Sequence, residues 1–156
     1  MRIGQGVDVH AFSDDPERVL VLGGVVLPGE RGLIGHSDAD VPTHALMDAL
    51  LGAAGLGDLG RHFADTDAAY KDASSLVLLD QVLAKLAVAG FQPVNADVTL
   101  ICESPRLAAH MGAMAEILSE RSGAPVSVKA TTTEHLGFLG RGEGIAALAV
   151  ALVEER

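Results

Sequence analysis

Cysteine is nearly absent from the sequence, which holds Cys102 alone. No disulfide bond can therefore form within the chain, and no CxxC motif for a metal or redox site is present. Structural disulfides belong to oxidising compartments, so we expect a cytoplasmic protein. The opening segment MRIGQGVDVH lacks the apolar run of a signal peptide, and no stretch approaches the roughly 20 apolar residues that span a bilayer. We therefore expect no membrane partner.

Basic residues are also scarce, with 11 Lys and Arg against 21 Asp and Glu, for a formal net charge of −10. They form no cluster on any segment of the chain. Because nucleic-acid binding requires a basic surface that neutralises phosphates, we expect no DNA or RNA partner. The P-loop motif GxxxxGK[ST] does not occur, so the sequence gives no support for that nucleotide chemistry.

Aromatic residues make up only 3% of the chain and tryptophan is absent, whereas glycine reaches 18 of 156 residues. Glycine is thus well above its average share of about 7%, and its positions call for a structural explanation. The 49% apolar and 21% charged residues are typical of a globular protein, and a mass of 16.0 kDa fits one domain over residues 1–156.

Apolar periodicity predicts the main elements. Alternating residues predict strands at 3–12, 94–100 and 126–131, and Gly23-Gly24 predicts a hairpin within 18–27. Helical spacing predicts three helices, which run from near Pro42 to Gly55 with Asp40 as N-cap, from about Ser74 to Ala89, and from Pro105 to Gly123. The inward stripe of the second helix is expected to hold Leu76, Leu79, Leu83 and Leu86.

The tail at residues 145–153 is apolar on every face, so it is expected to be buried, but periodicity leaves helix and strand open. The order of strands, hairpin and helices mixes hairpins with crossovers. It predicts a single α+β domain in which helices pack on one face of a mixed β-sheet.

A candidate metal site begins with Asp8 and His10, which point to the same side of the first predicted strand, where Gly4 and Gly6 add no bulk. His44, in the first turns of the following helix, would complete a set of two nitrogens and one oxygen, the ligand set of a catalytic zinc. A polar strand face turned to water is the alternative. Asp48, one turn beyond His44, either orients that ring, caps a turn or faces solvent.

Three polar loops add further candidates. In GHSDADV, His36 is suited to bind or protonate a phosphate, and Ser37 and Asp38 have no evident structural duty. GDLGRHFADTD combines glycines with carboxylates that suit hydroxyl recognition on a sugar or polyol, although a solvated acidic loop explains each carboxylate singly.

The third loop, KATTTEHLGFLGRGEG, places three threonines before Glu134, a set that can hold phosphate oxygens and Mg²⁺. Threonines also favour strands for steric reasons alone. Phe138 and Arg141 present an aromatic ring and a cation from a turn, unless Arg141 simply pairs with Glu143.

The segments GQGVDVHAF, GHSDADVPTHALMDALLGAAGLGDLGRHFADTD and KATTTEHLGFLGRGEGIA resemble the signature stretches of the 2-C-methyl-D-erythritol 2,4-cyclodiphosphate synthase family. The resemblance covers essentially the whole chain, in order. It implies a phosphorus–oxygen lyase of the non-mevalonate isoprenoid pathway that cyclises 4-diphosphocytidyl-2-C-methyl-D-erythritol 2-phosphate and releases CMP. It also implies a homotrimer with active sites between subunits, each holding Zn²⁺ and a second ion, Mg²⁺ or Mn²⁺.

Residue roles follow from the same resemblance. It implies zinc ligands at Asp8, His10 and His44, a ligand for Mg²⁺ or Mn²⁺ at Glu134, and assistance of phosphoryl transfer by His36 and Thr132. For the erythritol phosphate part it implies Ser37, Asp58, Leu59, Gly60, Phe63, Asp65 and Asp67. For the cytidine part it implies the stretch from Cys102 to Ala108, with Pro105 and Arg106, and the stretch from Ala130 through Thr131 to Thr132; Thr133 is a further substrate-binding position. At a cavity on the threefold axis it implies Phe138, Arg141 and Glu143. Gln5, Arg106 and His135 depart from the residues commonest in the family.

Two other functions fit the same residues. A zinc hydrolase would use a metal-bound water at the Asp8, His10 and His44 site and would release inorganic phosphate. A catalytically silent trimer would bind isoprenoid diphosphates through Phe138 and Arg141, but it would not require intact zinc ligands.

Overall fold

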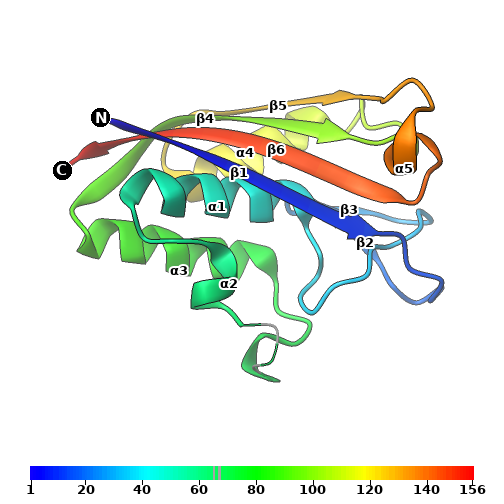
Figure 1. Cartoon of the computed structure of the whole chain (residues 1–156), viewed down its shortest axis with the longest axis horizontal. Coiled ribbons are helices and arrows are strands. Elements are labelled where there is room, and N and C mark those ends of the chain that lie inside the picture. Colours follow the sequence, from blue (N-terminus) through cyan, green and yellow to red (C-terminus); the bar gives the residue numbers. More distant parts are fainter. Residues whose placement is uncertain (65, 67) are drawn as a thin grey trace.

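A four-stranded mixed sheet forms the centre of the computed structural model, which describes residues 1–64, 66 and 68–156. Its strands lie in the order β1-β6-β4-β5, where β1 is Arg2–Ala11, β4 is Phe91–Ile101, β5 is Val126–Thr131 and β6 is Gly144–Glu155. Strand β6 pairs antiparallel with both β1 and β4, whereas β4 and β5 are parallel (Figure 1). The apolar tail is therefore a strand in the interior of the sheet.

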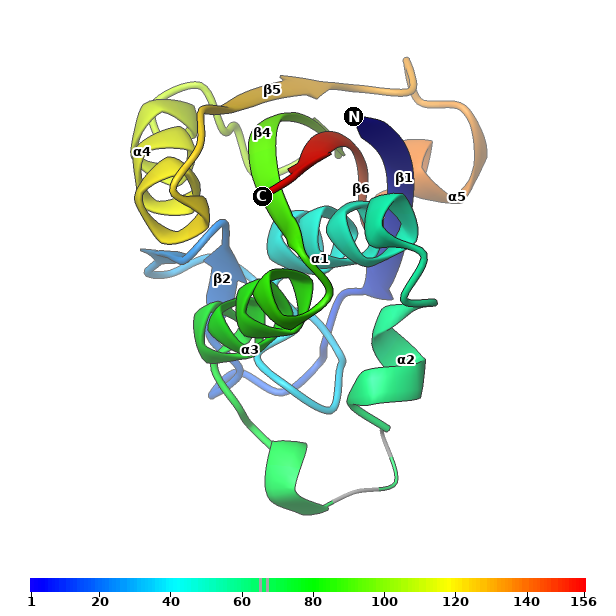
Figure 2. The ribbon, with the colours of Figure 1, turned by 90° about the vertical axis from the view of Figure 1, so that its left-hand side faces the viewer.

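The three long helices all lie on one side of this sheet, as predicted (Figure 2). Helix α1 (Val41–Ala54) packs directly on β1 and β6, α3 (Ser75–Val88) packs against α1, and α4 (Met111–Ser122) lies beside β5. Asp40 caps α1 by accepting a hydrogen bond from Thr43 N at 3.1 Å, and Gly55 ends it in a left-handed conformation with φ 72°. The sequence predicted both ends of this helix correctly.

Two helix predictions need correction. Helix α4 begins at Met111, not at Pro105, because residues 102–110 form turns in which Leu107 is nonetheless buried. The inward stripe of α3 is made of Leu78, Leu79, Val82 and Leu86, and Leu76 and Leu83 are only half-buried. The sequence also did not predict the short helices α2 (Leu59–His62), η1 (Ala68–Tyr70) and α5 (Gly137–Gly140).

The predicted hairpin forms a separate two-stranded sheet of β2 (Leu20–Leu22) and β3 (Val25–Leu27). Gly23 and Gly24 turn with φ values of 57° and 76°, which favour glycine. The fully buried carboxylate of Asp40 accepts a 2.7 Å hydrogen bond from the backbone N–H of each glycine. Burial raises the pKa of Asp40, and the nearby Asp38 carboxylate adds to that rise.

The two faces of β1 are used differently. Gly4 and Gly6 lie directly against α1, where an added Cβ would be 2.0 Å from the carbonyl oxygen of Ala49 or Ala45, respectively. The alternate apolar side chains face away from the helices and are exposed, with 72% exposure for Ile3 and 52% for Val7. The single chain therefore leaves an apolar outer sheet face uncovered.

Candidate functional site

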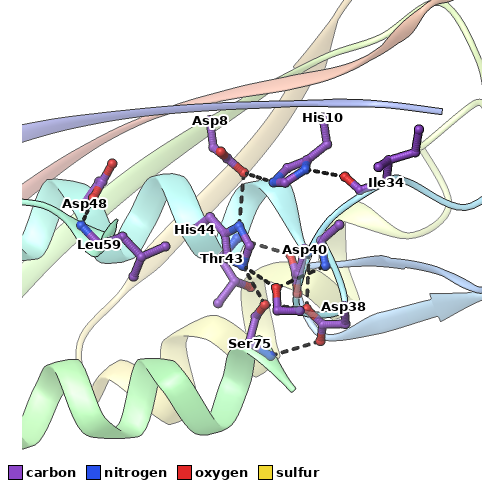
Figure 3. A network of polar contacts seen from close by, with 12 residues as sticks. Asp8, His10, Ile34, Asp38, Asp40, Thr43, His44, Asp48, Leu59 and Ser75 are labelled. Carbon is purple, nitrogen blue, oxygen red and sulfur yellow. Dashed lines mark hydrogen bonds and ion pairs between the residues drawn. The ribbon is translucent and has the colours of Figure 1, made fainter. Parts of the chain in front are cut away.

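Asp8, His10 and His44 come together where the end of β1 crosses the first turn of α1 (Figure 3). The close approach of strand and helix at the two glycines brings these side chains into reach of one another. Asp8 Oδ2 lies 3.1 Å from Nε2 of His10 and 3.1 Å from Nδ1 of His44. One ligand atom from each residue lies within 4.8 Å of the other two, as the spacing of the motif predicts.

The hydrogen bonds of His10 indicate what its inner nitrogen can do. His10 Nδ1 is 2.5 Å from the carbonyl oxygen of Ile34, and a carbonyl only accepts, so Nδ1 carries the proton. In the neutral ring, Nε2 then presents a lone pair toward the Asp8 carboxylate. Two acceptors at such a distance repel unless a proton or a metal ion lies between them. The three inner atoms therefore fit a divalent cation, and their types fit zinc.

Charges at this site are arranged to keep Asp8 ionised. Burial by itself raises the pKa of Asp8, but the N–H groups that the His10 and His44 rings donate to it when both ring nitrogens are protonated outweigh burial and hold the pKa well below its usual range. Burial lowers the pKa of His10, and the Asp8 carboxylate more than offsets this, so the pKa of His10 is raised. A carboxylate that stays negative next to two imidazoles is a cation-binding arrangement.

A cavity of about 440 Å³ opens over the three residues. It gathers most residues that the resemblance assigns to zinc and to the erythritol phosphate: Asp8, His10, His36, Ser37, His44, Leu59, Gly60 and Phe63. Tyr70 and Leu78 also line it, and the sequence analysis did not single them out. Asp58 is not among the lining residues and caps α2 by accepting from Arg61 N at 2.9 Å. The predicted Asp65 and Asp67 lie outside the described residues.

Asp48 lines the cavity but does not orient the His44 ring. Its Oδ1 accepts a hydrogen bond from Leu59 N at 2.6 Å, which ties α1 to the start of α2. The Nε2 atom of His44 is instead 2.8 Å from the hydroxyl of Ser75, on α3. That contact joins residues 31 positions apart in the chain, and no sequence motif predicts it.

A second cavity, of about 490 Å³, lies between the turns after β4 and the end of β5. It brings together the residues predicted for cytidine, namely Cys102, Pro105, Arg106, Ala108, Ala130, Thr131 and Thr132. Among the described lining residues, none is shared with the first cavity. In one chain, therefore, His36 and Thr132 line different cavities.

The turn that carries Thr132 and Glu134 is held by Glu103, to which the sequence assigned no role of its own within the cytidine stretch. Glu103 Oε1 accepts hydrogen bonds from Thr133 N at 3.0 Å, His135 N at 3.3 Å and Thr133 Oγ1 at 3.3 Å. Glu134 and His135 both have left-handed backbones, with φ 53° and 63°, which non-glycine residues rarely adopt. The Glu103 carboxylate thus stabilises the left-handed backbone of this turn, which forms part of the second cavity.

Arg18 is another residue that no motif indicated. Its guanidinium donates to the carbonyl oxygens of Leu33 at 2.8 Å, Gly35 at 3.3 Å and Ser37, and pairs with Asp72 at 3.4 Å. These contacts hold both sides of the loop on which His36 lies. The expectation that Asp38 lacks a structural duty is wrong, since it accepts from Ser75 N at 2.9 Å.

Phe138 and Arg141 lie on and after α5, outside the residues that line either cavity. Phe138 is 48% exposed. Arg141 donates to Glu143 Oε2 at 3.0 Å, so the alternative that these two residues pair with each other is confirmed. Cys102 is buried, and desolvation together with the Glu103 charge raises its pKa to about 11. A thiol that stays neutral at pH 7 is a poor nucleophile.

Comparison with known proteins decides the family. A profile of the YgbB family matches residues 1–154. The chain belongs to the YgbB family. This family member is 55% identical to the 2-C-methyl-D-erythritol 2,4-cyclodiphosphate synthase of Saccharophagus degradans, over 99% of this chain and 100% of the relative.

Solved structures agree. This YgbB-family fold superposes with TM-score 0.93 and 42% identity on the bifunctional IspDF of Campylobacter jejuni, over 99% of this chain but only 42% of that longer one. It superposes with TM-score 0.84 and 28% identity on IspF of Plasmodium falciparum in complex with CDP, over 99% of this chain and 96% of that chain. In the described part of the chain, no helix is both long and apolar enough to cross a membrane.

Proposed function

We propose that this chain is a lyase that converts 4-diphosphocytidyl-2-C-methyl-D-erythritol 2-phosphate to 2-C-methyl-D-erythritol 2,4-cyclodiphosphate and CMP. The observation that carries the proposal is the 55% identity over the full length of a relative with that activity in its name, combined with the Asp8, His10 and His44 cluster at the floor of a cavity. The product belongs to the synthesis of isoprenoid precursors.

In the reaction, an oxygen of the 2-phosphate attacks the β-phosphorus of the diphosphate. The bond from that phosphorus to the oxygen that bridges it to the cytidylate breaks, and CMP leaves with the electron pair. Since both reacting groups are anions, the main task is to bring them together against their repulsion. No protein nucleophile is required, which is consistent with the neutral, buried thiol of Cys102.

Asp8, His10 and His44 are the residues that would hold Zn²⁺. A bound divalent cation there offsets phosphate charge and orients the diphosphate. Glu134 would serve as the protein ligand of Mg²⁺ or Mn²⁺, and substrate phosphates would supply further oxygen ligands. His36 and Ser37, which line the first cavity, would bind phosphate oxygens, and Leu59, Gly60 and Phe63 would contact the erythritol.

The second cavity is the proposed cytidine site. Its volume of about 490 Å³ lies within the usual range of small-molecule pockets, and the structurally similar IspF of Plasmodium falciparum is described as a CDP complex. Ala108 and Ala130 in its lining have short side chains, which would leave their backbone groups accessible to a base. Thr132, at its edge, would contact the transferred phosphate, with Thr131 and Thr133 beside it.

A homotrimer would unite the two cavities. The supporting observations are that His36 and Thr132 line separate cavities in one chain, and that the outer sheet face exposes Ile3, Val7 and Val150. A head-to-tail contact repeated around a threefold axis would cover such a face and join one chain's metal site to its neighbour's cytidine pocket. Phe138 and Arg141 would then lie near that axis. The cellular location that we propose is the cytoplasm.

The deciding experiment follows both products of one incubation. Purified protein receives the cytidine diphosphate substrate, CMP is measured by chromatography, and the phosphorus product is identified by ³¹P NMR, before and after chelation. We expect CMP and a cyclic diphosphate in equal amounts, loss of both after chelation, and recovery with Zn²⁺ plus Mg²⁺. His44→Ala should be inactive and His110→Ala, which lies outside both cavities, should remain active.

Release of inorganic phosphate without a cyclic product would replace this assignment by the zinc hydrolase. Turnover that is unchanged after complete removal of metal would show that the three-residue cluster does not hold the catalytic ion.

A further inference from the structure

On the side away from Asp8, the His44 ring contacts two hydrogen-bonded side chains, Ser75 and Asp38, to which no role in the site has been assigned. His44 Nε2 is 2.8 Å from Ser75 Oγ, and the Ser75 hydroxyl is hydrogen-bonded to Asp38 Oδ1 (Figure 3). Asp38 Oδ2 also accepts from Ser75 N at 2.9 Å, at the beginning of α3. Ser75 is fully buried, so water does not replace either partner.

The positions of the protons in the hydrogen bonds among His44, Ser75 and Asp38 follow from what each group can donate. An ionised carboxylate only accepts, so the Ser75 hydroxyl proton points to Asp38. Ser75 Oγ then has only lone pairs left for His44, and it accepts the proton on Nε2. Nδ1 of His44 therefore bears the lone pair and faces Asp8 and His10, which is the form that binds a metal.

The opposite tautomer has its own stabilising partner. Asp8 Oδ2 is 3.1 Å from Nδ1 of His44 and would accept a proton from it. A ring protonated at Nδ1 presents a hydrogen in place of the lone pair, so a metal ion would have to displace it. The two ends of the ring thus compete for one proton, with Ser75 on one side and Asp8 on the other.

We propose that Asp38 and Ser75 are positioning residues that fix His44 as the Nε2–H tautomer and so keep Nδ1 ready for the metal. The inference rests on the proposed function only in taking the three-residue cluster as a metal site. His10 achieves the same result through a main-chain carbonyl, that of Ile34. A substitution cannot remove the main-chain carbonyl of Ile34. The hydrogen bonds from His44 to Ser75 and from Ser75 to Asp38, in contrast, can be broken by a side-chain variant.

Ser75→Ala is the sharpest perturbation available. Alanine keeps the Ser75 N–H bond to Asp38 and is a good helix former, so α3 retains its beginning. Only the hydroxyl contacts are lost. Ser74→Ala is the matched control, because Ser74 is the exposed N-cap of α3 and its side chain makes no capping hydrogen bond. Ser37 Oγ, 3.2 Å from His44 Nε2, remains as a poorer acceptor, so the Ser37→Ala/Ser75→Ala double variant removes both.

The first readout is independent of metal and of turnover. ¹⁵N NMR of the histidine rings in metal-free protein, at about pH 8 where an ordinary imidazole is neutral, reports which nitrogen carries the proton. We expect the Nε2–H form of His44 in the unmodified protein and in Ser74→Ala. Ser75→Ala should shift the ring toward Nδ1–H, and the double variant should shift it further.

The second readout is zinc affinity, measured by competition with a chromophoric chelator. Loss of an outer partner of a metal-binding histidine weakens affinity by about 10- to 100-fold, and we expect that loss in Ser75→Ala and not in Ser74→Ala. An unchanged tautomer or an unchanged affinity in both Ser75 variants overturns the inference. Absence of zinc binding by the unmodified protein contradicts the proposed metal site instead, and the metal-free NMR result still decides the tautomer.

Discussion

Replacing Gly6 by alanine places a methyl group where β1 and α1 touch through their main chains. The added Cβ would lie 2.0 Å from the carbonyl oxygen of Ala45 and 2.7 Å from the amide nitrogen of Ala49. Ordinary contacts between such atoms begin near 3.5 Å, so strand and helix must separate by roughly 1.5 Å. Neither neighbour is the end of a flexible side chain, and the helix cannot yield locally.

Overpacking of this kind costs about 1–3 kcal/mol, and the main-chain contact places Gly6→Ala near 3 kcal/mol. For a chain of this size, about 2–4 °C of melting temperature is lost per kcal/mol, which gives a decrease of about 6–12 °C. Gly52→Ala is the matched control on the same helix, since its Cβ would meet only Gln5 O at 3.9 Å. That change should stabilise the protein by about 0.5–1 kcal/mol through helix propensity.

The same separation carries His44 on α1 away from Asp8 and His10 on β1, so zinc affinity should fall in Gly6→Ala and not in Gly52→Ala. Melting is followed by circular dichroism at one fixed protein concentration, because the proposed assembly would make the melting temperature depend on concentration. A Gly6→Ala protein that melts within about 2 °C of the unmodified one, with unchanged zinc affinity, would refute the argument that main-chain contact positions the site.

Other predictions test residues outside the metal cluster. In Glu103→Gln a neutral amide oxygen replaces the carboxylate that accepts from Thr133 N and His135 N, so the turn is held less firmly and kcat should fall about tenfold in the CMP assay while zinc binding is unchanged; equal loss of zinc would contradict this. Arg18→Ala frees the His36 loop and should cost about 2 kcal/mol, or 4–8 °C of melting temperature, without rescue by lysine. Cys102, with its pKa raised to about 11, should react with iodoacetamide ever faster up to about pH 10, and a rate that levels off by about pH 9.5 would show an ordinary thiol. Val7→Asp, on the outer sheet face, should convert the proposed trimer to smaller species in sedimentation velocity; a trimer that stays intact would place the interface elsewhere.

Much of the fold follows from local sequence signals. The ends of α1 were predictable from two residues. The side chain of Asp40 accepts a hydrogen bond from a free N–H of the first turn, and Gly55 adopts the left-handed conformation that ends the helix. The hairpin was predictable because two adjacent glycines permit a turn that other residues resist. Asp8 and His10 share a face by the period of a strand, so two of the three residues of the candidate metal cluster were placed together before any packing was known.

Tertiary structure decided the rest, since the missing information depended on partners distant in the chain. The 145–153 tail is apolar on all sides and carries no periodicity, so only its pairing with β1 and β4 made it a strand. The glycine face of β1, not its apolar face, packs on α1, because close approach of two main chains requires the absence of side chains. The contacts of Ser75 with His44 and of Glu103 with Thr133 span about 30 residues each, and hydrogen-bond partners at that separation are chosen by the fold and leave no local pattern.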